Sequence, residues 1–186
     1  MINLYKFVYA FVVMFFAMTI SAYSAEIVMI DDSSIYIRGE IVSGDGDAFT
    51  TLLEKNPKTK YVAINTTGGL VEDAMSMAYL IYEKKLITVI PENAECYSMC
   101  PIIFLSGYEK VMMANQTLGF HPSYTMKPNG ERVLHPETSG QLSWWLGVLN
   151  VPLEIVWTMM GTSPYNLTAY TGEELNTLGV DIVLIE

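Results

Sequence analysis

The stretch Tyr61-Val-Ala-Ile-Asn-Thr-Thr-Gly-Gly-Leu-Val71 decides the fold class, because it joins two patterns of different period. Residues 61–64 form a short apolar run before a polar Gly-Gly turn, which predicts a buried strand. From Val71 to Tyr82 apolar residues recur three or four positions apart, and Glu72-Asp73 place acidic charge in the first turn of the predicted helix. A strand that passes through a tight turn into a helix is the repeating unit of an α/β protein.

The same alternation continues on both sides of this stretch. The other strands that we predict are Glu26–Met29, Ile35–Ile41, Leu86–Ile90, Lys110–Met113, Thr117–His121 and Val180–Ile185. The other predicted helices lie around Phe49–Leu53, over Met99–Gly107, over Leu142–Leu149, over Pro152–Met160 with Asn150 as its cap, and from a capping box at Thr171 and Glu174 to Gly179.

The pattern also predicts how the strands pair and how they are connected. We expect Lys110–Met113 and Thr117–His121 to pair with each other, and residues 122–139 to form a polar loop with a turn at residues 127–130. Strands alternate with helices in units of about 25–30 residues, and this order implies right-handed crossovers and a largely parallel sheet. The prediction is one α/β domain over residues 25–186.

Composition excludes several classes of protein. The chain has 186 residues, 51% of them hydrophobic, and 10 basic against 20 acidic residues give a net charge of −10. It is too apolar to be disordered, and it has neither the basic surplus nor the basic clusters that nucleic acid or an anionic membrane surface requires. Two Cys and two His, His121 and His135, exclude a four-thiolate zinc site and a His-rich metal site. We therefore predict no metal and no cofactor.

Residues 1–24 differ in kind from the rest and predict a secretory signal peptide. Lys6 is their only charge, residues 7–20 are almost unbroken apolar sequence, and small residues follow at Ala22 and Ser24. Cleavage follows Ser24 or, alternatively, Ala25; an uncleaved membrane anchor is the other interpretation, for which the apolar run is short. The mature protein is then periplasmic or secreted, where disulfides are permitted and ATP and coenzyme A are not supplied.

Three segments follow predicted strands and carry the chemically useful residues, namely Asn65–Gly69, Cys96–Cys100 and Gly119–Pro122. Such sites collect at the carboxyl ends of strands in α/β sheets. Gly68-Gly69 and the N–H of Met99 offer backbone donors for an oxyanion hole, Ser98 is a candidate nucleophile, and His121 is its candidate base. The alternative for Ser98 is an ordinary helix N-cap.

These motifs also occur in an order that resembles a known family. The chain from Ser34 to Asp181 is similar to the proteolytic subunit of Clp protease and, more closely, to exported relatives in the Clp/crotonase superfamily. The resemblance runs through Ile37–Ile41, Ala63–Gly69, Tyr97–Met99, Gly119–Pro122 and Leu178–Asp181. It implies a fold of repeated ββα units with a mostly parallel sheet.

The resemblance also implies roles for single residues. Ser98 falls on the nucleophile, His121 on the general base, and Met99 with Gly69 (or Gly68) on the oxyanion-hole amides. The family has an acid shortly before the last helix, where this chain has Asn166 and Leu167. Asn166 is the candidate third catalytic residue; it orients an imidazole without the charge that stabilises an imidazolium. Asp181 is a weaker alternative because it lies on a predicted strand.

Cys96 and Cys100 flank Ser98 symmetrically. In an oxidising compartment residues at this spacing can reach disulfide geometry, and such a bridge would hold the Ser98 turn rather than the fold. Two buried free thiols are the alternative.

Three functional hypotheses follow. The leading one is an exported, ATP-independent serine hydrolase, a serine peptidase that acts on peptides or unfolded proteins without an ATPase partner. The resemblance adds a homo-oligomer as an expected assembly. The second hypothesis is a catalytically inactive Clp-like binding or scaffold protein in the periplasm, which the missing acid favours. The third is acyl-thioester chemistry as in crotonases, which export away from coenzyme A disfavours.

Overall fold

The computed structural model describes residues 24–185. Its strands are β1 (Glu26–Asp31), β2 (Ser34–Arg38), β3 (Tyr61–Asn65), β4 (Ile87–Val89), β5 (Glu109–Met113), β6 (Thr117–Phe120), β7 (Tyr124–Met126), β8 (Arg132–Leu134), β9 (Thr168–Thr171) and β10 (Val183–Ile185). Its helices are α2 (Asp45–Lys55), α3 (Val71–Glu83), α4 (Cys100–Leu105), α5 (Pro136–Val148), α6 (Leu153–Gly161) and α7 (Gly172–Thr177).

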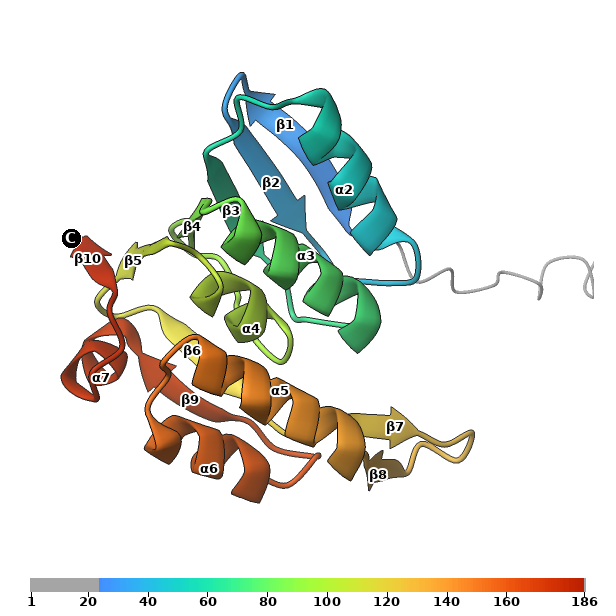
Figure 1. The fold of residues 1–186 in the computed structure, drawn as a ribbon. Coiled ribbons are helices and arrows are strands. Elements are labelled where there is room, and N and C mark those ends of the chain that lie inside the picture. The colour runs from blue at the N-terminus through green and yellow to red at the C-terminus, as the bar shows by residue number, and fades with distance from the viewer. Residues whose placement is uncertain (1–23, 186) are drawn as a thin grey trace, which may run out of the picture.

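Six strands form the main sheet in the order β1-β2-β3-β4-β5-β10. The pair β1–β2 is antiparallel, and every other neighbouring pair is parallel. The helices α2, α3 and α4 lie along one face of this sheet (Figure 1). The predicted α/β class with a mostly parallel sheet is therefore confirmed.

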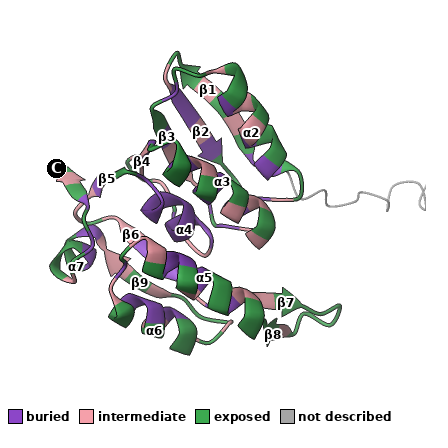
Figure 2. Ribbon diagram, in the orientation of Figure 1, coloured by how far each residue is buried: buried purple, intermediate pink, exposed green. Residues whose placement is uncertain are grey.

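The core lies between this sheet and its helices. All six residues of α4 are buried, and α3 buries the apolar face that its periodicity predicts (Figure 2). A short helix with no exposed side depends on tertiary packing for its stability, because six residues are too few for an isolated helix. The residues directly before α4 are consequently attached to a helix that is packed on all sides.

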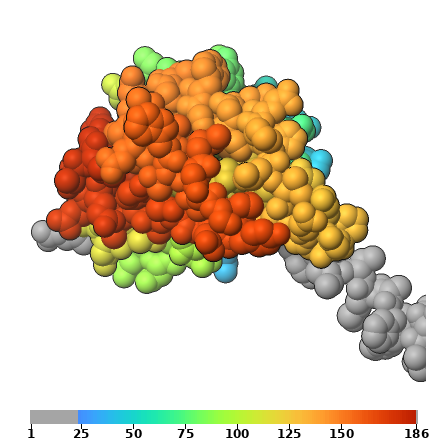
Figure 3. Space-filling view, turned by 90° about the horizontal axis from the view of Figure 1, so that it is seen from below, coloured from blue at the N-terminus to red at the C-terminus, as the bar shows by residue number. Residues whose placement is uncertain are grey.

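A second layer packs against α4 and carries the rest of the chain. It contains the antiparallel pair β6–β9, the hairpin β7–β8 and the helices α5 and α6. Seen from below, this part of the chain covers most of the molecular face, with the hairpin at one side (Figure 3). The indole Nε1 of Trp145 in α5 donates to Ser106 Oγ at the end of α4, which joins the two layers.

Two sequence expectations are wrong about pairing. Strand β5 does not pair with β6; it lies between β4 and β10, whereas β6 pairs with β9. The chain leaves the main sheet after Met113, where the Gln116 side chain accepts from the N–H of Met113 and donates to the carbonyl of Pro91. The polar stretch expected as a loop instead contains the hairpin β7–β8.

The helix boundaries near residue 150 also differ from the prediction. Helix α5 begins at Pro136, because His135 accepts a hydrogen bond from the N–H of Thr138 and caps the helix. Asn150 is not the cap of α6, which has Pro152 in that position. Asn150 has a φ of +57° and lies in the turn between the helices, a conformation that Asn tolerates better than most residues. The predicted capping box of Thr171 and Glu174 is present.

The predicted signal peptide, residues 1–24, lies outside the described residues except for Ser24. Within residues 24–185, no helix combines the length and apolar character that crossing a membrane requires.

Candidate active site

The site lies where chain segments outside the main sheet pair through three isolated parallel β-bridges. Ile41 pairs with Gly69, Thr66 with Cys96, and Tyr97 with Gly119. The bridges bring together the three segments that the sequence analysis selected. They set Gly68-Gly69, Ser98 and the end of β6 side by side.

Ser98 occupies a strained turn between the bridge at Tyr97 and helix α4. Its φ is +60°, which is uncommon for a residue with a side chain. Its N–H donates to the carbonyl of Gly119 at 2.8 Å, and a disulfide between Cys96 and Cys100 spans the turn with a Cα–Cα distance of 5.0 Å. A sharp, strained strand-to-helix turn presents the nucleophilic Ser in α/β-hydrolases.

Ser98 does not act as a helix cap. The N-cap of α4 is Met99, and no side chain accepts a hydrogen bond from the first turn of the helix. Within the described residues the Ser98 hydroxyl makes no hydrogen bond to a protein group and lines a pocket instead. Helix capping is therefore not the role of Ser98 in this structure.

Gly68 and Gly69 are required by close approach as well as by conformation. Their φ values are +92° and +138°. A Cβ on Gly68 would lie 2.6 Å from the Ser98 Cβ and 2.7 Å from the Met99 nitrogen, and a Cβ on Gly69 would lie 2.0 Å from the carbonyl oxygen of Ile41. The two glycines therefore let one backbone segment lie directly against the Ser98 turn.

Two amides beside Ser98 are available to a ligand. The Gly68 N–H donates to Thr66 Oγ1 at 3.0 Å, and the Ser98 N–H is taken by Gly119. The N–H groups of Gly69 and Met99 have no acceptor among the described residues. Of the two glycines left open by the sequence, Gly69 is thus the one with a free donor.

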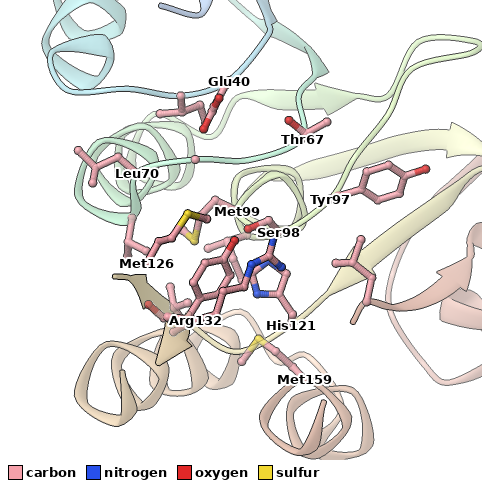
Figure 4. A pocket seen from close by; sticks show the side chains of 18 of the residues that line it. Glu40, Thr67, Leu70, Tyr97, Ser98, Met99, His121, Met126, Arg132 and Met159 are labelled. Atoms are coloured by element: carbon pink, nitrogen blue, oxygen red, sulfur yellow. The ribbon is translucent and has the colours of Figure 1, made fainter. Parts of the chain in front are cut away.

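His121 follows β6 and lines the same pocket as Ser98 (Figure 4). Its Nδ1 lies 2.8 Å from the carbonyl oxygen of Pro122. A carbonyl oxygen accepts and cannot donate, so Nδ1 carries the proton and Nε2 has the free lone pair. This is the tautomer that a general base needs.

Burial lowers the pKa of His121 below its usual value of 6.5. The Arg132 charge lowers this pKa further, while the hydrogen bond to Pro122 opposes both effects because it stabilises the imidazolium. At neutral pH the ring is consequently neutral and can accept a proton.

No carboxylate among the described residues contacts His121. Asn166 and Leu167 line the pocket, but the Asn166 side chain makes no hydrogen bond to His121 within the described part of the chain. Asp181 is not in the pocket; its charge acts on Lys110, whose pKa it raises against the larger lowering effect of burial. The carbonyl of Pro122 occupies the position that an acid would need.

The pocket has a volume of about 720 Å³ and an uneven lining. Ser98 and His121 lie at its centre (Figure 4). Apolar side chains surround them, from Leu70, Met99, Ile102, Met126, Leu142 and Met159. The charged groups of the lining are Glu40 and Arg132.

Comparison with known proteins gives structural but not sequence matches. Neither a protein-family model nor a curated protein matches the sequence. A mutant of a membrane-bound stomatin-specific protease superimposes with a TM-score of 0.63 and 19% identity over 82% of this chain and 78% of that one. The catalytic domain of the ClpP protease from Plasmodium falciparum gives 0.62 and 17%, over 81% and 83%.

A third match carries different chemistry. A structure of a dehydratase/decarboxylase enzyme couple involved in polyketide beta-branching gives a TM-score of 0.53 and 12% identity, over 86% of this chain and 74% of that one. Structures of proteases and of a dehydratase/decarboxylase couple thus resemble this chain in fold.

The chain has the Clp protease/crotonase fold. At these identities the likeness establishes the fold alone, because one fold hosts many unrelated activities.

Within this Clp/crotonase fold, the hairpin β7–β8 adds residues that the sequence analysis missed. Arg132 lies between the rings of Tyr124 and Tyr165, 4.7 and 5.7 Å from their centroids, and donates to the carbonyl of Pro164 at 2.8 Å. These contacts fix a cation beside His121. The signal available in the sequence was Asn129-Gly130, the strongest short-range mark of a hairpin.

Proposed function

We propose that the protein is a serine peptidase that works with Ser98, His121 and a backbone oxyanion hole. The observation that carries the proposal is the Ser98 turn: a Ser at positive φ, with no hydrogen bond to protein for its hydroxyl, lines one pocket together with a free backbone donor and a neutral His. The likeness in fold to two proteases supports it.

The reaction assigns one task to each group. Ser98 Oγ attacks the peptide carbonyl carbon while His121 Nε2 takes the hydroxyl proton. The new oxyanion accepts hydrogen bonds from the N–H groups of Gly69 and Met99. His121 then gives the proton to the leaving amine, and a water molecule activated by the same nitrogen releases the acyl group.

The Pro122 carbonyl orients the His121 ring, which is one of the two functions of the acid in a catalytic triad. It holds the Nδ1–H of His121 and keeps Nε2 free, but as a dipole it stabilises the imidazolium less than a carboxylate does. Replacement of the acid by Asn in a serine protease lowers kcat by about 10⁴. We therefore propose a slow enzyme, with Asn166 as a pocket residue rather than an essential one.

The substrate and the location follow from the pocket and the N-terminus. Apolar side chains around Ser98 suit an apolar residue beside the scissile bond of a peptide or an unfolded protein. Export by the segment of residues 1–24 would separate the protein from ATP, so we propose ATP-independent action in the periplasm or outside the cell. Homo-oligomerisation stays a prediction.

A fluorophosphonate probe tests the proposal directly. The full chain, expressed with its own N-terminal segment, should be labelled on Ser98, and labelling should vanish in Ser98→Ala. Ser143→Ala is the matched control, because Ser143 lies in α5 outside the pocket lining, with its half-buried hydroxyl bonded only to the carbonyl of Ser139. A folded protein that remains unlabelled from pH 5 to pH 9 would contradict the proposal.

That negative outcome would favour the inactive binding protein. One observation supports this second candidate: His121 has no carboxylate partner among the described residues. The same pocket would then hold a peptide without cleaving it. Peptide binding to the Ser98→Ala variant, measured by isothermal titration calorimetry alongside the absent labelling, would establish this candidate.

A further inference from the structure

The carboxylate of Asp45 is buried at the first residue of α2 without a cationic partner. Asp45 is 3% exposed, and no Lys, Arg or His lies within 4 Å of it among residues 24–185. A buried carboxylate of this kind is costly unless a positive charge or several donors compensate it. Here the carboxylate accepts three hydrogen bonds, from the Ser24 hydroxyl and from the N–H groups of Ala25 and Val42.

Two of the three donors to this carboxylate belong to the first described residues. The backbone nitrogen of Ala25 lies 3.1 Å from Asp45 Oδ2, and Ser24 Oγ lies 2.5 Å from Oδ1. Ala25 is itself buried, at 7% exposure. The first described residues thus lie at the same corner as the N-terminal end of α2 (Figure 1).

We propose that the Ser24–Ala25 peptide bond is a processing site and that the new α-ammonium group of Ala25 forms a buried ion pair with Asp45. Hydrolysis adds one water: the Ser24 carbonyl carbon gains a hydroxyl and becomes a carboxylate, and the Ala25 nitrogen gains protons and becomes an ammonium. The proposal rests on the export interpretation of residues 1–24 and is independent of the peptidase activity.

The geometry favours this bond over the neighbouring one. The Ala25 nitrogen is already within ion-pair distance of Asp45, so the charged pair forms without moving the fold. The ammonium has three N–H donors, which replace both the Ala25 amide and the lost Ser24 hydroxyl. Cleavage after Ala25 would instead remove both donors and leave Asp45 with the N–H of Val42.

A second carboxylate, that of Asp73, lies at the same corner. Asp73 Oδ1 of α3 accepts from the N–H groups of Gly44 and Gly46, at 2.9 Å each. Asp73 thus accepts from the residues on either side of Asp45, which places two acidic side chains at the start of α2. The ammonium of Ala25 would bring a cation to this acidic corner.

The ion pair would also anchor part of the active site. Asp45 Oδ2 accepts from the Val42 N–H at 2.8 Å, and Ile41 exchanges hydrogen bonds with Gly68 and Leu70. Ile41 and Val42 line the pocket. Processing thus supplies the charge that holds the segment against which the Gly68-Gly69 turn packs.

The test begins with the N-terminus of the exported protein. The full chain is expressed in a secreting bacterial host, and intact mass with N-terminal sequencing should give Ala25 as the first residue. A chain that begins at Glu26, or one that keeps residues 1–24, would overturn the proposal.

Acylation of the α-amine at pH 7 then tests the ion pair. In the folded protein the N-terminal peptide should be acylated at least about tenfold more slowly than in urea, because a buried, paired ammonium is a poor nucleophile. Equal rates in the folded and unfolded protein would overturn the pairing, and this comparison needs no variant.

A charge-matched pair of variants completes the test. Asp45→Asn should expose the amine to acylation and lower the Tm. Asp47→Asn removes the same charge from an exposed position in the same turn of α2 and should change neither. If Asp45→Asn leaves both the acylation rate and the Tm at the values of Asp47→Asn, the ion pair does not exist.

Discussion

His121 hydrogen-bonds through Nδ1 to the carbonyl oxygen of Pro122, the next residue in the chain, at 2.8 Å. A histidine that is oriented by its own neighbour needs no distant acid to select its tautomer. The bond therefore separates two functions that a triad acid combines, orientation and charge stabilisation, and only the first is supplied here.

Removal of the imidazole should abolish nucleophilic attack. His121→Ala should reduce the rate of fluorophosphonate labelling by about 10³ or more, because Ser98 loses its proton acceptor. Asn166→Ala should change that rate little, since Asn166 makes no hydrogen bond to His121 among the described residues. Equal losses in the two variants would mean that Asn166 orients the ring after all.

The pH dependence of labelling should report the lowered pKa of His121. Protonation removes the base, so the rate should be full above pH 6.5 and be lost as the pH falls through a pKa below that value. A midpoint above 6.5 in the wild-type protein would contradict the burial of the ring as the dominant influence on its pKa.

Arg132 should act on the same midpoint through its charge. Arg132→Ala removes a cation that opposes protonation, so the pKa of His121 should rise and labelling should be lost at a higher pH. Tyr165→Phe is the control, because it deletes the hydroxyl that accepts from the Arg132 N–H but keeps the charge. An equal shift of the pH midpoint of labelling in both variants would mean that displacement of the loop, and not the charge of Arg132, causes the effect.

Gly68 should tolerate no side chain. Gly68→Ala places a Cβ against Ser98 and Met99 at a φ of +92°, and we expect a loss of at least about 2 kcal/mol in unfolding free energy, together with lost labelling. Gly140→Ala, at an exposed position inside α5 with open space around it, should instead stabilise by about 0.5–1 kcal/mol. Urea unfolding of both variants measures the contrast.

The disulfide should matter more to the site than to the fold. Joint replacement of Cys96 and Cys100 by Ala removes a closed loop of about five residues, for which chain entropy predicts a cost of about 2 kcal/mol. Labelling of Ser98 should slow as well, because the turn at φ +60° loses a constraint. Reductant should slow the labelling of Ser98 in the wild-type protein and leave the labelling rate of the double Ala variant unchanged. An equal labelling rate of the wild-type protein with and without reductant would show that the bridge is incidental.

The sequence by itself determined the α/β class, most strand and helix positions and the three segments of the candidate site. These follow from local signals: apolar periodicity, Gly-Gly after a strand, and the capping box at Thr171. The strand-end motifs alone made Ser98 and His121 candidates, the resemblance of ordered motifs implied the same two roles, and the structure places both residues in one pocket.

Tertiary structure decided what those signals cannot encode. The partner of β6, the choice of Gly69 as the glycine with a free amide, the partner of His121 Nδ1 and the approach of Arg132 all depend on contacts between residues distant in sequence or on backbone direction. Asp45 is the clearest case: in sequence it is one acid of 20 beside a turn, and only folding buries it against the nitrogen of Ala25. Local propensity acts over a few residues, whereas burial and hydrogen-bond partners are properties of the assembled chain.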